Sequence, residues 1–348
     1  MTRALMTRAL GVALLAALLV AATGCGGEDD AAGADDDGTL VVYSGREEEI
    51  VEPLFERFEE QTGIEVEARY GDSAELAATI AEEGDNSPAD VFFAQDAGTL
   101  GAVAAEGLLA QLPQELLGRV DARFRDPDGR WVGTSGRARV VVYNTEALSE
   151  DELPDTVFGY TDPRWKGRLG LAPTNASFQA FVSAMRLTEG EERTREWLEG
   201  IKANEPKFYE KNTPVVEAVA NGEIDAGFVN HYYLSLVQAE SPDAPVANHF
   251  LQAGDPGALV NVAGAAVVAG AEHAEAAQRF VEFLLSEEGQ RFYAEEAAEA
   301  EYPLAEGVEP REGLPPLESL QDQDVSLGDL GAELESTLEL LNELGYTS

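Results

Sequence analysis

The chain has 348 residues, of which 44% are apolar, so it is long enough for two domains or lobes and apolar enough to form a core. Its 23 Lys and Arg stand against 66 Asp and Glu, and the formal charge of −43 argues against nucleic acid or an anionic membrane surface as a partner. A single Cys excludes intrachain disulfides and multi-cysteine zinc sites, and three His leave little material for a His-rich metal site.

The first 38 residues have the pattern of a bacterial lipoprotein leader and tether. Two Arg precede an apolar run over residues 9–22, which is too short to span a bilayer comfortably. Small residues lead to Cys25, and a Gly- and Asp-rich stretch follows it. We therefore predict a signal peptide over 1–24 and, over 25–38, a lipidated Cys25 with an acidic tether that anchors the protein to the bacterial cell membrane. A plain secreted protein is the alternative, and Met6 is an alternative start because the first five residues repeat there.

The next part of the chain alternates expected strands and helices. Short apolar or alternating runs predict strands, and one-sided apolar stripes predict helices. Such patterns predict a strand at 39–44, a helix at 48–62, a strand at 64–70, a helix at 74–83 with Ser73 as its cap, and a strand at 89–93. Strands that alternate with helices at this spacing are typical of a parallel sheet in an α/β fold.

The remaining chain continues the α/β pattern. Strands are expected at 139–143, 169–172, 226–229 and 263–268. Helices are expected at 177–186, 191–203, 214–221, from about 232 with Asn230 as its cap, and at 273–286, 287–299 and 330–344.

Common enzyme signatures are absent from the sequence. Residues 133–136 (Gly-Thr-Ser-Gly) have the wrong spacing for a nucleophile elbow, and neither a His-Glu-x-x-His pair nor a Walker loop occurs. Residues 126–129 (Asp-Pro-Asp-Gly) lack the first and last ligands of an EF-hand loop. The sequence therefore gives no support for an enzyme, although the missing signatures do not exclude one.

The most unusual local sequence is Phe-Val-Asn-His-Tyr-Tyr at 228–233, where two adjacent tyrosines follow a predicted buried strand. Ligands of α/β folds bind at the carboxyl ends of parallel strands. A phenolate is a hard oxygen ligand that suits a trivalent cation such as Fe(III). The pair therefore indicates a metal site, or, as the plainer alternative, two ordinary packing aromatics.

Short segments that match one protein family occur along the chain in that family's order, at 42–46, 87–93, 135–143, 221–226, 230–233, 255–259 and 300–304. Through them the chain, from residue 39 to about 304, resembles the bacterial ferric-ion-binding proteins, the iron-delivering components of ABC importers. The resemblance implies an α/β type II periplasmic-binding-protein fold, with two lobes, two crossing strands and a ligand cleft. It also implies a permease and its ATPase as partners.

The resemblance also implies site residues and lobe boundaries. Tyr232 and Tyr233 match the tyrosines that bind Fe(III) in the family. The family holds iron together with a synergistic anion, which would be phosphate, carbonate or citrate here. The positions that match its anion site are Asn175, Ala176, Ser177, Asn212 and Asn230, although the last two are also explained as helix caps. The lobes are expected to comprise 39–137 with 261–303, and 138–260 with 304–348.

Two departures from the family leave the first-lobe ligands open. Glu47 stands where many members have a His, and Gln95 stands where many have a Glu, so we treat both as candidate ligands. Arg46 and Arg137 are candidates for pairing with the anion or for holding the closed lobes together. His231 is expected at the protein surface, at the start of a helix.

Two other functions fit parts of the pattern. The same fold with a small organic solute, such as a phosphonate, a thiamine-like compound or a polyamine, is suggested by the departures at Glu47 and Gln95. A lipid-anchored enzyme or sensory ectodomain is the third hypothesis. We expect a monomer that binds no nucleic acid.

Overall fold

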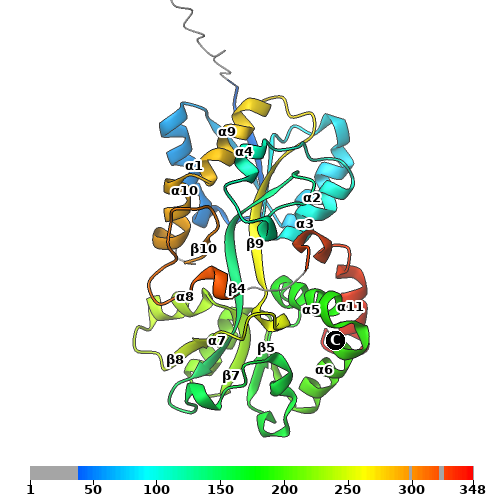
Figure 1. Cartoon of the computed structure of the whole chain (residues 1–348), viewed down its shortest axis with the longest axis vertical. Coiled ribbons are helices and arrows are strands. Elements are labelled where there is room, and N and C mark those ends of the chain that lie inside the picture. The colour runs from blue at the N-terminus through cyan, green and yellow to red at the C-terminus, as the bar shows by residue number, and fades with distance from the viewer. Residues whose placement is uncertain (1–37, 298–299, 321–324, 348) are drawn as a thin grey trace, which may run out of the picture. The chain divides into compact units, whose positions relative to one another are not determined.

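The computed structural model describes residues 38–297, 300–320 and 325–347, and its core is a mixed sheet with helices on both sides (Figure 1). The predicted signal peptide, Cys25 and nearly all of the predicted tether lie outside the described residues. The strands are β1 (Leu40–Ser44), β2 (Val66–Tyr70), β3 (Val91–Ala94), β4 (Val132–Asn144), β5 (Leu169–Leu171), β6 (Lys207–Phe208), β7 (Ala226–Asn230), β8 (Val246–His249), β9 (Val260–Val267) and β10 (Tyr302–Pro303).

The helices follow the predicted order with two additions, α3 and α4. They are α1 (Glu48–Thr62), α2 (Ser73–Glu83), α3 (Ala97–Ala105), α4 (Gln114–Leu117), α5 (Ala176–Glu189), α6 (Glu191–Ala203), α7 (Asn212–Ala220), α8 (Tyr233–Glu240), α9 (Ala274–Leu284), α10 (Glu287–Arg291) and α11 (Leu334–Glu343). A π-helical turn (Phe292–Glu296) follows α10, and a 3₁₀ turn (Leu327–Leu330, η9) precedes α11. No helix in these described ranges is long and apolar enough to cross a membrane.

The first helix shows how the sequence determines local structure. Helix α1 has the predicted bounds, and Val51, Leu54, Phe55 and Phe58 are its buried stripe. It ends at Gly63, whose φ of 71° is left-handed, a conformation that glycine adopts without steric cost.

Strands β4 and β9 run side by side, and β4 continues beyond β9 to pair with β7 and β8 (Figure 1). The sheet order is β2-β1-β3-β9-β4-β7-β5-β6, with β8 and β10 also paired to β4. Strand β4 pairs with β9 up to Ala138 and with β7 from Arg139 onward, so it changes partners in its middle. These two strands are the crossing strands of a two-lobed fold.

The sequence prediction missed the first half of β4 and misplaced several boundaries. Residues 133–136 are small or polar, so they lack the apolar run that indicates a strand, yet every residue of β4 is buried. The cap of α2 is Asp72 rather than Ser73, whose hydroxyl instead accepts the Gln95 N–H at 2.9 Å. The predicted helix at 287–299 is regular only over α10.

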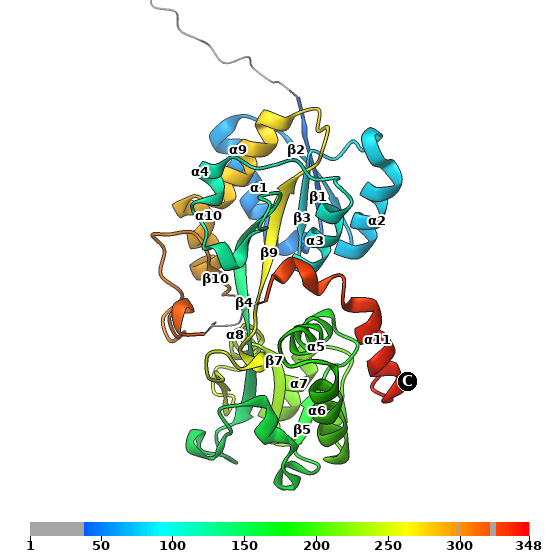
Figure 2. The ribbon, with the colours of Figure 1, turned by 45° about the vertical axis from the view of Figure 1, so that its right-hand side comes forward.

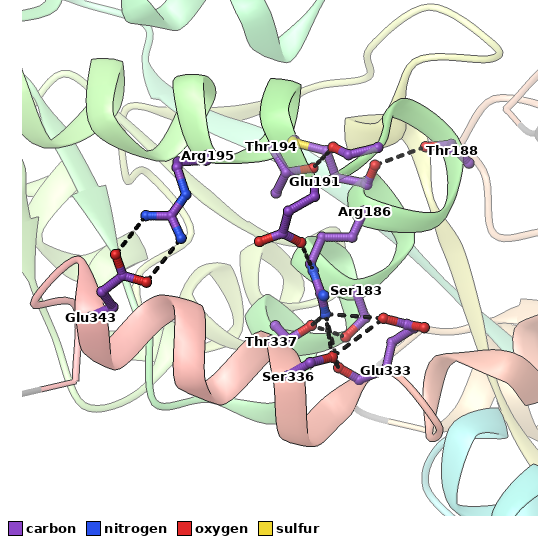
Figure 3. A network of polar contacts seen from close by, with 12 residues as sticks. Ser183, Arg186, Thr188, Glu191, Thr194, Arg195, Glu333, Ser336, Thr337 and Glu343 are labelled. Carbon is purple, nitrogen blue, oxygen red and sulfur yellow. Dashed lines mark hydrogen bonds and ion pairs between the residues drawn. The ribbon is translucent and has the colours of Figure 1, made fainter.

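The C-terminal segment contacts helices of both lobes. The turn η9 packs on α3, where Gly98 and Gly101 allow the two backbones to approach closely. Helix α11 then lies beside α5 (Figure 2). Figure 3 shows its polar contacts, in which Arg186 of α5 bonds Ser336 and Thr337, and Arg195 of α6 makes a two-point ion pair with Glu343.

We expect Gly101→Ala to destabilise the protein by about 1–3 kcal/mol, because a Cβ there would lie 2.2 Å from the carbonyl oxygen of Gly328. Urea denaturation measures the change. Ala102→Leu, an exposed position in the same helix, is the control and should change stability by less than about 0.5 kcal/mol. Helix propensity alone predicts that Gly101→Ala is at least as stable as the wild type. That result would show that the contact between Gly101 and Gly328 is not tight.

Candidate metal centre

Three neighbouring parallel strands end at one edge of the sheet and lead into the helices that carry the predicted site residues. Strands β7 and β6 both pair in parallel with β5. The chain leaves β5 toward Asn175 and α5, leaves β6 toward Asn212 and α7, and leaves β7 at Asn230 toward α8. Because the carboxyl ends of parallel strands lie at the same edge, these polar residues meet in space.

The two tyrosines follow the end of β7. Tyr232 is the last residue before α8 and is buried, whereas Tyr233 is the first residue of the helix and is half-buried. Their ring centroids lie 4.3 Å apart, with the ring planes inclined by 33°. The fold therefore holds both rings together at this edge of the sheet.

Four of the predicted anion-site residues contact one another or a shared partner. The Asn175 Oδ1 accepts the Ser177 N–H at 3.0 Å and the Ser177 hydroxyl at 2.6 Å. The Asn212 Nδ2 donates to Asn175 Oδ1 at 3.0 Å and to Ser177 Oγ at 3.2 Å. Ala176, the fifth position, is the first residue of α5, and the positive end of the helix dipole favours an anion there.

Asn212 and Asn230 are not helix caps, so that alternative is wrong. Helix α7 begins after Lys211 and α8 after Tyr232, and neither helix has a side-chain cap. The Asn230 Oδ1 instead accepts a hydrogen bond from Arg139. Within the described ranges, the Asn212 Oδ1 is buried without a hydrogen-bond partner.

Arg139 contacts two of the predicted site residues, and the sequence reasoning missed it. It faces Asn230 across the β4–β7 pair, and its Nη1 donates to Ser177 Oγ at 3.2 Å and Asn230 Oδ1 at 3.3 Å. Among the residues that the structure describes, its buried Nη2 has no hydrogen-bond partner and its guanidinium makes no ion pair. A charged residue inside the apolar run of β4 was the available signal, since buried charges are rare unless they have a role.

The charge of Arg139 acts on the tyrosine pair. Burial lowers the pKa of the guanidinium to about 10, while Tyr233 and Tyr232 oppose that shift when their phenols are ionised. The group therefore stays protonated at neutral pH, and it places a positive charge beside both tyrosines.

The first-lobe candidates lie apart from this cluster. Glu47 is exposed and precedes α1, and Gln95 is half-buried after β3. The Gln95 N–H bonds the Ser73 hydroxyl, whereas the tyrosine rings contact each other and, for Tyr232, the ring of His231. Nor do the described residues include a group of three or more His, Cys, Asp and Glu that could hold a metal.

Arg46 and Arg137 share a buried carboxylate, Glu301. The Arg46 Nη1 lies 3.0 Å from Glu301 and the Arg137 Nε 3.6 Å, and the Ser135 hydroxyl donates to the same carboxylate. Burial alone would raise the pKa of Glu301, but the two guanidinium groups hold it well below its usual range. The segment before β10 is thereby fixed to β4 and to the end of β1.

His231 is buried, so the expectation that it lies at the surface is wrong. Its side chain is 2% exposed and packs against Tyr302, with the ring centroids 4.9 Å apart. Burial lowers its pKa to about 4, so the imidazole is neutral at physiological pH. A His in a short turn gives no periodic burial signal, and its partners lie far away in the sequence.

The fold has two lobes joined by β4 and β9, and polar groups gather where its parallel strands end. These features define a solute-binding protein of the type II periplasmic fold. The model of the bacterial extracellular solute-binding protein family matches residues 86–319. The major ferric iron-binding protein of Neisseria meningitidis serogroup B is 38% identical over 344 residues, which cover 98% of this chain and 99% of that protein.

Solved structures agree with this relationship. Iron-bound HitA from Pseudomonas aeruginosa has a TM-score of 0.80 at 36% identity and covers 88% of this chain and 99% of its own. A Trichodesmium protein in complex with iron and citrate has a TM-score of 0.80 at 29% identity, with 89% and 100% covered. The chain belongs to the bacterial ferric-ion-binding protein family, as its sequence motifs predicted, and its relatives are binding proteins rather than enzymes.

Proposed function

We propose that this protein captures Fe(III) outside the cytoplasm with the phenolate oxygens of Tyr232 and Tyr233, together with a synergistic anion, and delivers it to the permease of an ABC importer. The observation that carries the proposal is the paired tyrosine rings beside a buried guanidinium that makes no ion pair in the described structure. The iron-bound and ferric-binding relatives support the choice of metal. They do not favour an organic solute.

The anion follows from the charges at the site. Two phenolates leave one positive charge of Fe(III) uncompensated, and Arg139 adds a second positive charge nearby. An anion held by Asn175, Ser177 and Asn212 at the start of α5 would balance these charges in a region of low dielectric. Phosphate, carbonate and citrate all have the required oxygens, and the citrate in the Trichodesmium complex supports the class.

The first lobe would complete the coordination when the two lobes close on the iron. Glu47 and Gln95 follow β1 and β3, whose carboxyl ends share an edge, and both offer oxygen atoms. We infer lobes of 39–137 with 261–303 and of 138–260 with 304–348, a division supported by the change of partners in the middle of β4.

Arg46 and Arg137 would hold the closed state through Glu301 or assist the anion. Their shared carboxylate favours the first role, because both guanidinium groups lie within 3.6 Å of it. We further propose that Cys25 carries a lipid that anchors the protein to the cell membrane, and that the protein acts as a monomer.

The test of the function is a titration of iron-free protein with ferric citrate, followed by visible spectroscopy. Bound Fe(III) should give a phenolate-to-iron absorption band at one equivalent of iron per chain. A protein that stays colourless throughout the titration, while apo-protein folding is verified by circular dichroism, would refute the proposal.

We expect Arg139→Met to weaken iron binding by about 10–100-fold and to flatten its dependence on the concentration of citrate or phosphate, because the charged hydrogen bonds to the site are lost. Iron affinity measured across a series of anion concentrations checks this. Arg139→Lys keeps the charge and should recover part of the dependence.

The matched control is Arg168→Met. This residue lies just before β5, at the opposite end of that strand from the site, and pairs with Asp225. Its loss should leave the anion dependence unchanged. An Arg139→Met protein with the anion dependence of the wild type would show that the guanidinium does not serve the anion.

A further inference from the structure

His231, the residue before Tyr232, makes hydrogen bonds through its backbone and through both ring nitrogens. Its backbone N–H donates to the Ala138 carbonyl at 2.9 Å, and its own carbonyl accepts from Asn248 Nδ2 at 2.7 Å. The imidazole is bonded on both sides, with Nδ1 3.2 Å from the Ala138 nitrogen and Nε2 3.1 Å from the Ala300 oxygen.

The partners determine which ring nitrogen carries the proton. The Ala138 amide donates, so Nδ1 must offer its lone pair. The proton is then on Nε2, which donates to the Ala300 carbonyl. Because both nitrogens are used, neither is free to bind iron without breaking one of these bonds.

The hydrogen bond to Ala300 connects the two parts of the site. Ala300 precedes Glu301, which bonds Arg46, and Arg46 is the residue before Glu47. A continuous set of contacts thus runs from the tyrosine turn, through the crossing strand β4 and the segment before β10, to the start of α1.

We propose that His231 is a positioning residue for the iron site, resting on the proposed function of Tyr232 and Tyr233 as ligands. Its two ring hydrogen bonds fix the turn before Tyr232 against Ala138 and Ala300. The edge-to-face contact of its ring with Tyr232, at a centroid distance of 5.8 Å, further limits the orientation of that phenol. The phenol oxygens are thereby presented to the metal in one geometry, which lowers the cost of ordering them on binding.

The experiment compares the ferric forms of wild type, His231→Phe and His231→Gln. The Phe variant keeps the aromatic packing but removes both ring hydrogen bonds, whereas Gln retains a terminal donor for the Ala300 carbonyl. We expect His231→Phe to bind iron at one equivalent with affinity reduced about 10–100-fold, a shifted phenolate-to-iron band and faster release to a chelator. His231→Gln should recover part of each change.

His249→Phe is the matched control, since His249 is also buried and also bonds a carbonyl, that of Pro154, but is not adjacent to the tyrosines. It should lower thermal stability without moving the iron band. The proposal is overturned if His231→Phe likewise changes only the stability.

A ligand role for His231 would overturn the proposal differently. Protein labelled with ¹⁵N-histidine and loaded with iron would then show nitrogen coupling to the metal in pulsed electron paramagnetic resonance, and we expect none. If the wild type gave no phenolate-to-iron band at all, the proposed function itself would be wrong, which separates the two failures.

Discussion

Tyr232→Phe and Tyr233→Phe should each reduce iron affinity by well over 100-fold. Loss of a group that only supports a metal ligand typically reduces metal affinity by about 10–100-fold, so a larger loss is expected when a ligand itself is removed. Each change removes a single oxygen and keeps the ring, so the packing of the two rings at 4.3 Å is retained. Fe(III) then loses one of two hard anionic ligands that would balance its charge. Competition with a coloured chelator measures the affinity, and the phenolate-to-iron band should weaken in each single variant and vanish in the double variant.

Tyr209→Phe provides the control for these substitutions. Tyr209 is half-buried on the same side of the sheet as α7, and its hydroxyl has no hydrogen-bond partner among the described residues. Its loss should leave both the affinity and the band unchanged. Wild-type affinity in both Tyr232→Phe and Tyr233→Phe would mean that the iron ligands are elsewhere.

Glu301→Gln should lower the free energy of unfolding by about 3–5 kcal/mol, because it leaves two buried guanidinium groups without the carboxylate that they share. The amide preserves the shape of the side chain, so the effect comes mainly from charge. Urea denaturation at pH 7 measures it. The control is Glu343→Gln, which breaks the exposed pair with Arg195 and should cost less than about 1 kcal/mol.

The same carboxylate predicts a dependence of stability on pH. The folded state holds the pKa of Glu301 below its ordinary value of 4.5, so the stabilisation is complete above that value and is lost as the pH falls toward the folded pKa. The difference in stability between wild type and Glu301→Gln should therefore be largest at neutral pH and shrink between about pH 5 and pH 3. A difference that stays constant over this range would show that Glu301 contributes by packing rather than by charge.

Residues close together in the sequence were predictable. The apolar stripe of α1 and the glycine that ends it determined the bounds of that helix. The two tyrosines are adjacent in the sequence, so a strand followed by a helix was enough to predict that they lie together. The predicted anion-site asparagines came from a family resemblance carried by short motifs. In the structure Asn212 contacts Asn175 and Ser177, and Asn230 is connected to Ser177 through Arg139.

The charge excess of the sequence argued against nucleic acid and anionic membrane surfaces as partners, and the tyrosine motif indicated hard-oxygen chemistry. The tertiary structure alone decided which charges are buried and what they interact with. Arg139 interacts electrostatically with the tyrosines, Arg46 and Arg137 share Glu301, and His231 is buried between Ala138 and Ala300. These partners are separated by 69 to 255 residues, for example 255 between Arg46 and Glu301 and 69 between His231 and Ala300. Burial and pairing at such distances depend on how the strands cross, and no local pattern of residues encodes that crossing.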